Sequence, residues 1–391
     1  MRMLSRFFGL ISCLLLVGAC NSSPGSSGSG ASTSGDVIRI GLSGALTGGD
    51  AILGQTQREG VQLAVDEINA AGGIQGHQID LITEDEANDP SRMAQIAQKF
   101  INVDHVDAIL GGTNDGTAVV LAQTAESANV PLVVPFANGN QITAGRKWAF
   151  QVDVASSSFV QGIVTYDAKA YKKICITYDN NGFGQEDRDL AVSDLKALNV
   201  TPAAVVELPN EGQDYTPQLQ QLQSAGCEVT ISPDSGTNVA QLRKNMVQLG
   251  YEPVITGPNS LAFQSMIDVG QNFVEHKVFF MDLIDASKPA VIDFQSKFTA
   301  RFGSPATSGF ELLGYDAMKV LAAALEKGWP DKTKVRDALE GLQNFALVSG
   351  GTDSTLSYSA TVHNRPTPSD LVWRWVDKGA FANAPIPFPT Q

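Results

Sequence analysis

Short apolar runs alternate with amphipathic helical patterns along the first two thirds of the chain. The segments between the runs carry apolar residues at helical spacing, as Val61, Ala64 and Ile68 do, and they end at glycines such as Gly72. Strands that alternate with helices of this length predict parallel sheets covered by helices on both faces. We therefore expect an α/β protein with two doubly wound parallel sheets in tandem. The runs that we interpret as strands span residues 37–42, 79–83, 106–111, 132–134, 172–178, 203–208, 228–232 and 254–256.

The stretch from Val106 to Gly139 indicates where such a sheet would present a site. Two glycines end its first strand, and Asn114 and the residues after it supply the side chains that begin a helix. A second short strand then ends at the turn 135–139. Two parallel strands joined by a helix bring both turns to the same sheet edge, which is where open α/β sheets bind ligands. The stretch therefore predicts a small-molecule site.

The last third of the chain departs from this alternation. Helical patterns cover residues 289–302, 311–327 and 334–342, and residues 371–376 form an apolar run that predicts a terminal strand. Helices beyond the second sheet indicate that the chain returns to complete the first unit and then crosses again.

The first 35 residues have the features of a targeting segment and a linker. Two arginines precede an apolar stretch at residues 7–17, which is too short to span a bilayer comfortably. It is followed by Cys20 and by residues that are almost wholly small or polar, as in a flexible tether. We predict a signal peptide over residues 1–19, then a lipidated Cys20 and a flexible Ser/Gly tether over residues 20–35. The alternative is an ordinary signal peptide that happens to contain a cysteine.

Composition bounds the class of protein and of partner. The 391 residues include 43% hydrophobic and 17% charged side chains, as in an ordinary folded protein with room for two cores. The 27 basic and 41 acidic side chains give a formal net charge of −14. No cationic surface is then available to displace counterions from phosphates, so we expect no nucleic acid partner.

The sequence shows no pattern typical of a catalytic or metal site. The four histidines are scattered, and there is no HExxH, CxxC, P-loop or GxSxG motif. We therefore expect no catalytic residue, no metal and no cofactor in a protein that is not an enzyme. Beyond the leader, Cys175 and Cys227 each lie in an apolar run, which fits either two buried free thiols or one disulfide.

Four phrases in a specific order and spacing carry a family resemblance. They are IGLSGALTG at 40–48, AVDEINAAGGIQG at 64–76, DEANDP at 85–90 and GYDA at 314–317. Together they make the chain from Val37 onwards resemble the substrate-binding proteins of branched-chain-amino-acid-type ABC importers. These leucine-binding-protein-like proteins have the type I periplasmic binding protein fold.

The resemblance implies two lobes, joined by a hinge of three crossovers, that close over a small polar metabolite. By this pattern residues 36–155 with 283–347 form lobe 1, and residues 156–282 with 348–391 form lobe 2. It further implies a monomer outside the cytoplasm of a bacterium, held to a membrane of the cell envelope only by its lipid, that delivers its ligand to an ABC permease. The alternative is a ligand-sensing receptor module of the same fold that signals through a partner protein.

In that family, lobe 1 holds the ligand carboxylate with hydroxyl and backbone N–H groups at a helix N-terminus. The corresponding position here is Asp115, next to Asn114. Asp115 either contacts the ligand or only caps its own helix, and in both cases its charge disfavours a carboxylate at that spot. For Asn138 the alternative to a ligand contact is a turn role that stabilises Gly139. The other lobe 1 residues expected to line the cleft are Ser43, Leu53, Phe136 and Ala137.

Lobe 2 is expected to contribute four residues to the cleft. Phe183 lies between two glycines, where the family often places an aromatic ring against the ligand. Asp234 and Ser235 follow a predicted strand and are expected in the cleft or next to it. Asn259 stands where members that bind amino acids use an acidic residue to hold the ammonium group.

The changes at positions 115 and 259 affect opposite ends of an amino acid ligand. Gaining an acidic residue at one end of the ligand and losing one at the other cannot both leave the binding of an α-amino acid in the usual orientation unchanged. We therefore hypothesise that the ligand is a neutral polar or cationic small molecule, such as an amide or amine, or an amino acid held the other way round.

Overall fold

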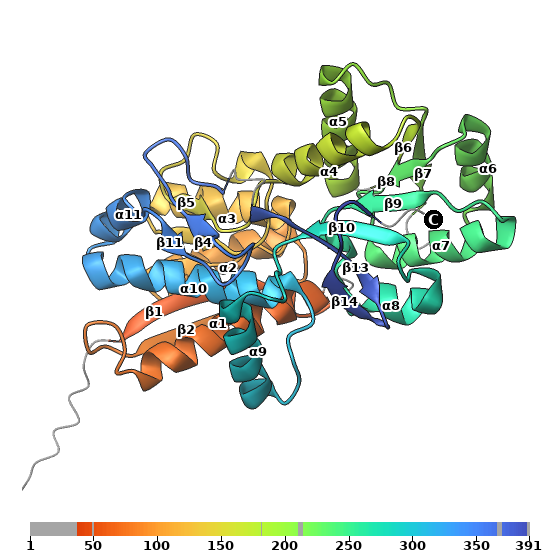
Figure 1. The fold of residues 1–391 in the computed structure, drawn as a ribbon. Coiled ribbons are helices and arrows are strands. Elements are labelled where there is room, and N and C mark those ends of the chain that lie inside the picture. Colours follow the sequence, from red (N-terminus) through yellow and green to blue (C-terminus); the bar gives the residue numbers. More distant parts are fainter. Residues whose placement is uncertain (1–36, 49–50, 181, 210–213, 366–369, 389–391) are drawn as a thin grey trace, which may run out of the picture. The chain divides into compact units, whose positions relative to one another are not determined.

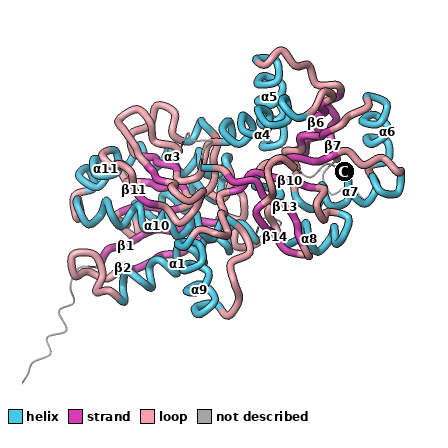
Figure 2. The backbone as a smooth tube through the Cα atoms, viewed as in Figure 1, coloured by secondary structure: helices cyan, strands magenta, loops and turns pink. Residues whose placement is uncertain are grey.

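The computed structural model describes residues 37–48, 51–180, 182–209, 214–365 and 370–388 (Figure 1). The predicted signal peptide, Cys20 and the tether lie outside the described residues. In the described part, the strands form two larger sheets, which Figure 2 shows as two groups of magenta segments.

The first sheet contains five parallel strands in the order β2-β1-β3-β4-β5. The strands predicted at 37–42, 79–83, 106–111 and 132–134 are confirmed. The interior strands β3 and β4 are fully buried, as short apolar runs in a parallel sheet are expected to be. Its strands are β1 (Ile38–Gly44), β2 (Ile79–Asp85), β3 (Ala108–Leu110), β4 (Leu132–Val134) and β5 (Ala149–Gln151).

The second sheet contains seven strands in the order β14-β13-β10-β9-β8-β6-β7. Five are parallel, and the two from the end of the chain, β13 and β14, pair antiparallel at one edge. The interior strand β10, third in this order, was not predicted from the sequence. The strands are β6 (Ile174–Asp179), β7 (Ala204–Leu208), β8 (Val229–Ile231), β9 (Val254–Gly257), β10 (Val278–Asp282), β13 (Val372–Asp377) and β14 (Ala380–Asn383).

Helices cover both sheets, as the α/β prediction requires. Met93 and Phe100 of α2, fully buried, pack with Leu121 of α3 against one face of the first sheet. The larger helices are α1 (Ala51–Ala70), α2 (Pro90–Asn102), α3 (Asp115–Ala128), α4 (Ser156–Ala170), α5 (Gly182–Ala197), α6 (Thr216–Ala225), α7 (Gly236–Leu249), α9 (Pro289–Phe302), α10 (Gly309–Gly328) and α11 (Lys332–Glu340). Short elements are α8 (Gln264–Gly270), η1 (Asn140–Ile142), η2 (Asn259–Leu261) and η3 (Gln271–Phe273).

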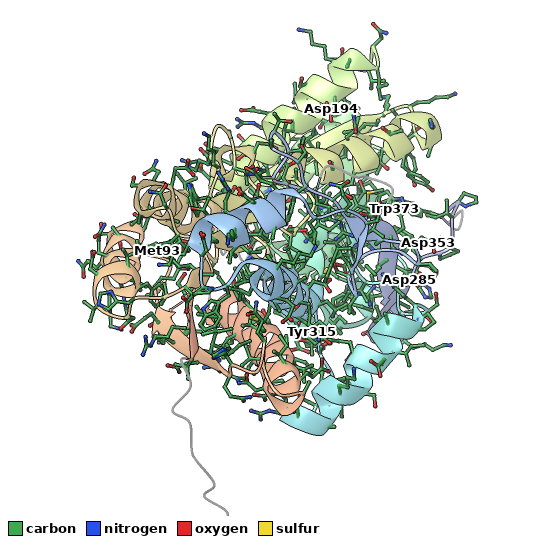
Figure 3. All side chains as sticks on the ribbon, turned by 90° about the vertical axis from the view of Figure 1, so that its left-hand side faces the viewer. Met93, Asp194, Asp285, Tyr315, Asp353 and Trp373 are labelled. Atoms are coloured by element: carbon green, nitrogen blue, oxygen red, sulfur yellow. A yellow bond between two sulfur atoms is a disulfide. The ribbon has the colours of Figure 1, made fainter. Side chains whose placement is uncertain are left out.

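The late helix α10 returns to the first sheet and packs against α1 (Figure 1). A β-carbon added to Gly60 would lie 1.9 Å from the backbone oxygen of Glu311, and one added to Gly314 would lie 2.5 Å from that of Gln57. The two backbones therefore touch where only glycine fits. Beside this contact, the hydroxyl of Tyr315, labelled in Figure 3, donates to Glu67 at 2.6 Å.

Three passages of chain connect the two sheets. The first follows β5, and the second follows β10, where Ile284 pairs with Gly350 of the third. The third includes β11 (Phe345–Ala346) and β12 (Thr355–Leu356), which pair with each other and with neither large sheet.

The exact lobe boundaries stay a prediction. Beyond β12, the Tyr358 hydroxyl still donates to the backbone oxygen of Gln151 in β5 at 2.7 Å, and Arg365 pairs with Val154. We therefore propose that the third passage reaches lobe 2 only after Arg365, rather than at residue 348 as the sequence pattern indicates.

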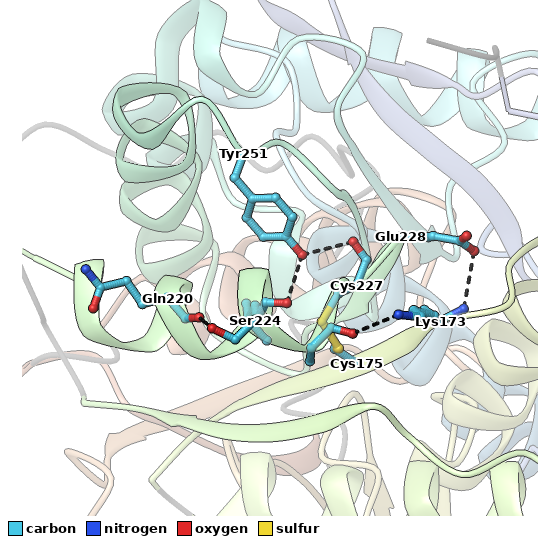
Figure 4. Close-up of a disulfide and its surroundings, with 9 residues drawn as sticks. Lys173, Cys175, Gln220, Ser224, Cys227, Glu228 and Tyr251 are labelled. Atoms are coloured by element: carbon cyan, nitrogen blue, oxygen red, sulfur yellow. Dashed lines mark hydrogen bonds between the residues drawn. A yellow bond between two sulfur atoms is a disulfide. The ribbon is translucent and has the colours of Figure 1, made fainter.

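A disulfide joins Cys175 and Cys227, with Cα atoms 5.7 Å apart (Figure 4). Of the two states that the sequence left open, the free thiols are wrong, because β6 and β8 are neighbours and bring both residues together. The Tyr251 hydroxyl donates to the backbone oxygen of Cys227 at 2.9 Å and holds this end of the sheet (Figure 4).

One buried acid predicts a pH dependence of stability. Asp167 of α4 is fully buried and accepts a hydrogen bond from Thr256 at 2.6 Å, and burial raises the pKa of this carboxyl to about 8. The folded protein keeps the proton up to about pH 8, whereas the unfolded chain releases it near pH 4. The folded state therefore loses stability as the pH rises through this window.

Replacing this acid by its isostere removes that loss. For Asp167→Asn we expect the free energy of unfolding, relative to the natural chain, to rise by at least ~1 kcal/mol between pH 5 and pH 8. Urea unfolding at a series of pH values measures this difference, with the exposed Asp80→Asn as the matched control. If the free energy of unfolding changes with pH in the same way for Asp167→Asn and for the natural chain, the raised pKa of Asp167 is contradicted.

Candidate functional site

A cavity of about 770 Å³ is enclosed by turns and helices that belong to both sheet units. It forms where turns after β3, β4 and β9 meet the start of α5, at the carboxyl ends of parallel strands as predicted. Its described lining consists of Leu53, Asn88, Thr113, Asn114, Asp115, Gly116, Phe136, Ala137, Asn138, Gln141, Asp153, Gly182, Phe183, Glu186, Asn259, Ser260, Phe263 and Phe310.

The N-terminus of α3 forms one wall of the cavity. Asn114, not Asp115, caps this helix, since its side-chain oxygen accepts the backbone N–H of Thr117 at 3.0 Å. The capping role considered for Asp115 is therefore wrong. Asp115 is the first helical residue, and its carboxylate accepts the backbone N–H of Gly139 at 3.0 Å across the neighbouring turn. Burial raises the pKa of Asp115, although the backbone N–H groups of Gly139 and Asn138 oppose this shift.

The turn after β4 is held from behind by Gln151. Its side-chain amide donates to the backbone oxygens of Ala137 at 3.0 Å and of Gly139 at 3.2 Å. The side-chain oxygen of Asn138 accepts a hydrogen bond from the Ser156 hydroxyl at 2.6 Å. Asn138 thus ties the turn to Ser156 and also lines the cavity, and its ligand contact stays a prediction.

Helix α5 supplies the facing wall from lobe 2. It begins at Gly182, and Phe183 and Glu186 of its first turns line the cavity. Glu186 was not predicted. Burial raises the pKa of Glu186, and the charge of Asp115 from the other lobe raises it further.

Asp187 follows Glu186 on the same helix and is buried. It is 1% exposed, and neither of its carboxyl oxygens has a hydrogen-bond partner among the described residues. Burial raises its pKa well above the ordinary range, and the charges of Glu186 and Asp115 raise it further. The three acids therefore lie within electrostatic reach of one another.

Asp153, on the first passage between the sheets, is a second unpredicted acid in the lining. It is 1% exposed and accepts the backbone N–H of Val154 at 2.7 Å. Burial raises its pKa well above the ordinary range, against the opposing effects of the Arg365 charge and of the Asn259 side chain. Asn259 is thus next to an acid that the sequence did not place there.

Aromatic rings form a continuous apolar wall. Phe310, the second residue of α10, lies with its ring centre 4.7 Å from that of Phe136 and 5.0 Å from that of Phe263. Since these rings come from separate segments of the chain, sequence periodicity gave no signal for their contact. Phe183 was the one aromatic predicted from lobe 2.

Three predicted residues lie outside the lining. Ser43 is fully buried on β1. Asp234 accepts a hydrogen bond from Thr177 at 2.8 Å, and Ser235 caps α7. Burial and the neighbouring charge of Asp179 raise the pKa of Asp234 well above its usual range. Asp234 and Ser235 support the turn beside the cavity, because the Asp234 backbone oxygen accepts the hydroxyl of the lining residue Ser260 at 2.8 Å.

The lining combines acids, amides and rings. It contains three carboxyl groups, and none of its described residues is lysine, arginine or histidine. Amide side chains offer both donors and acceptors, and four phenylalanines offer apolar surface. The arrangement suits a small molecule that has a polar donor end and an apolar body.

A second hollow of about 680 Å³ lies at the opposite edge of the second sheet. Cys227 and Pro253 in its lining precede their strands, so it lies at amino ends of the sheet. Ligands of open α/β sheets bind at the other edge, which favours the cavity between the sheets as the functional site.

Comparison with known proteins identifies related sequences and structures. A family model described as "Periplasmic binding protein" matches residues 37–366. The Leu/Ile/Val-binding protein homolog 7 of Brucella abortus (strain 2308) is 26% identical over 325 residues, which covers 78% of this chain and 81% of that protein. Homolog 8 of the same strain is 25% identical over 310 residues, 74% of this chain and 76% of that protein.

Solved structures share the fold. The periplasmic binding protein type 1 of Bordetella pertussis Tohama I superposes with a TM-score of 0.79 at 21% identity, covering 90% of this chain and 100% of that one. LivJ of Streptococcus pneumoniae, solved in complex with isoleucine, gives 0.77 at 20% identity, covering 89% and 99%. In the part of our chain that is described, no helix has the length and apolar character needed to cross a bilayer.

Proposed function

Because the chain belongs to the periplasmic binding protein family, we propose that it is the substrate-binding component of an ABC importer. Membership implies a location outside the cytoplasm. In this proposal the chain acts as a monomer, is anchored through lipidated Cys20, and delivers a small polar ligand to a permease. The sensing role is not favoured, since the relatives are named as binding proteins.

One observation carries the proposal: the cavity is lined from both sheets. Phe136 follows a strand of the first sheet and Asp115 begins α3 beside it, whereas Phe183 lies on α5 and Asn259 follows β9 of the second sheet. A ligand that contacts both sheets favours their approach, and the closed form presents a joint surface to a partner. The volume of about 770 Å³ fits an amino-acid-sized or slightly larger molecule.

A thermal-shift screen of the chain from Gly35 onwards tests the binding role. The panel sets amino acids against amides, amines, polyols and aromatic acids. A ligand present at a hundred times its dissociation constant adds about 2.7 kcal/mol of stability, which gives a clear rise in melting temperature. If no compound of any class shifts the melt, the binding role is contradicted.

Phe183→Ala tests where the hit binds. Truncating an aromatic ring that contacts the ligand is expected to weaken binding about tenfold. Phe273→Ala is the matched control, because Phe273 is 36% exposed and lies outside the cavity lining. Calorimetry on both variants checks this, and equal affinities would place the ligand elsewhere.

Transport of the hit by a reconstituted permease, with and without this protein, tests the importer role.

A further inference from the structure

We propose that the ligand is a small organic cation whose ammonium group binds between Asp115 and Glu186, with its apolar body against Phe136, Phe263 and Phe310. This inference rests on the proposed function and names the substrate class of the same cavity. It goes beyond the relatives, which are named as Leu/Ile/Val-binding protein homologs.

Two carboxylates from different sheet units line the same cavity. Asp115 belongs to α3 over the first sheet and Glu186 to α5 over the second, and both line the cavity. The charge of Asp115 also raises the pKa of Glu186. Two like charges that approach in a partly desolvated space repel each other, and a cation between them replaces that repulsion with two attractive pairs.

A buried acceptor in the cavity lining has no donor among the described residues. Asp153 lines the cavity at 1% exposure, and one of its carboxyl oxygens accepts no hydrogen bond from them. Buried polar atoms are nearly always hydrogen-bonded, so this oxygen points to a donor that a ligand brings.

The described lining offers no counter-charge to an anionic group of a ligand. None of the described lining residues carries a positive side chain. The N-terminus of α3 would attract an anion, but the carboxylate of Asp115 already lies at that helix start. A ligand carboxylate would therefore meet Asp115 and Glu186 without a counter-charge.

The aromatic wall completes the site for an organic cation. The ring of Phe310 packs against two others. Its centre lies 4.7 Å from that of Phe136 and 5.0 Å from that of Phe263. Their surface suits an aromatic or branched aliphatic body, and aromatic faces also attract a nearby ammonium group. Hydrated metal ions or polyols would leave this wall unused.

The test uses matched probes that differ only in charged groups. Calorimetry at pH 7 compares 2-phenylethylamine, phenylalanine and 3-phenylpropanoate, and likewise 3-methylbutylamine, leucine and 4-methylpentanoate. We expect the better of the two amines to bind at least tenfold more tightly than its amino acid and its carboxylic acid. If an amino acid or acid binds more tightly than its amine, or if neither amine binds, the cation assignment is overturned.

Two isosteric variants locate the ammonium group. Asp115→Asn and Glu186→Gln are each expected to weaken amine binding at least tenfold, because each leaves one counter-charge in place of two. Asp189→Asn on the same helix is the control, since Asp189 is exposed and outside the lining, and it should change affinity less than twofold. If Glu186→Gln binds the amine as tightly as the natural chain does, the proposal is overturned.

These outcomes separate the cation assignment from the binding function. Tight binding of leucine or a carboxylate, lost in Phe183→Ala, would keep the binding role and overturn only the cation class. Failure of every compound in the wider panel would contradict both.

Discussion

Reduction of the Cys175–Cys227 disulfide is expected to lower the free energy of unfolding by about 4 kcal/mol. The bond closes a loop with a sequence separation of 52 residues, and a loop of that length loses roughly this much chain entropy in the unfolded state when it is cross-linked. The loop includes strand β7 and helices α5 and α6, so removing the cross-link affects much of the second sheet unit.

Urea unfolding with and without dithiothreitol measures this effect on the chain from Gly35 onwards. That chain contains no other cysteine. The double variant Cys175→Ala/Cys227→Ala should unfold like the reduced protein and should not respond to dithiothreitol. A double variant as stable as the oxidised chain would show that the disulfide adds nothing. The bond also fits a protein that folds outside the reducing cytoplasm.

Gly60→Val is expected to destabilise the protein by about 3 kcal/mol, the upper range for forcing extra atoms into a packed core. The α1–α10 contact has no space for a side chain here, because even a β-carbon would lie 1.9 Å from the backbone oxygen of Glu311. A helix backbone cannot rotate away as a side chain does, so the two helices must separate and open part of the core.

Gly182→Val is the matched control for this prediction. Gly182 also lies in a helix, and a β-carbon there would meet no atom within 4 Å. Its stability should change by no more than about 0.5 kcal/mol. Ligand-free chemical unfolding compares the two variants, and similar losses in both would mean that close packing of α1 and α10 is not the cause.

Short apolar runs predicted most of the parallel strands, and the interior strands β3, β4 and β8 are buried on both faces. The runs at 132–134 and 254–256 agree with β4 and β9 to within one residue. The strand β10, which was not predicted, has the sequence VFFMD. A short apolar run of this kind does not distinguish a strand from a buried helix segment, and no glycine or proline separates it from the apolar residues Leu283 and Ile284.

The candidate site was predicted where it depends on turns between neighbouring elements. Asp115, Phe136, Asn138 and Asn259 all line the cavity, because each follows the carboxyl end of a parallel strand. Asp234 also follows a strand, but its side chain turns inward to Thr177. Sequence position fixes the sheet edge of a residue and not the direction of its side chain.

The acids that most change the chemistry were not predictable from local pattern. Glu186 is a polar residue on a helix, which usually indicates a solvated face, and Asp153 lies in an apolar extended segment. They reach the cavity only because the second sheet unit places α5 opposite α3 and because the first passage between the sheets lies under the site. Such long-range juxtaposition has no signature along the chain.

A crystal structure of the protein with the tightest compound from the panel locates the ligand directly. We expect the compound between the two sheets, with a nitrogen donor at Asp115 and Glu186 and its apolar part against Phe310. A compound bound only in the hollow at Tyr166 and Tyr251 would contradict the functional site. Leucine bound with its carboxylate at the start of α3 would instead contradict the ligand class.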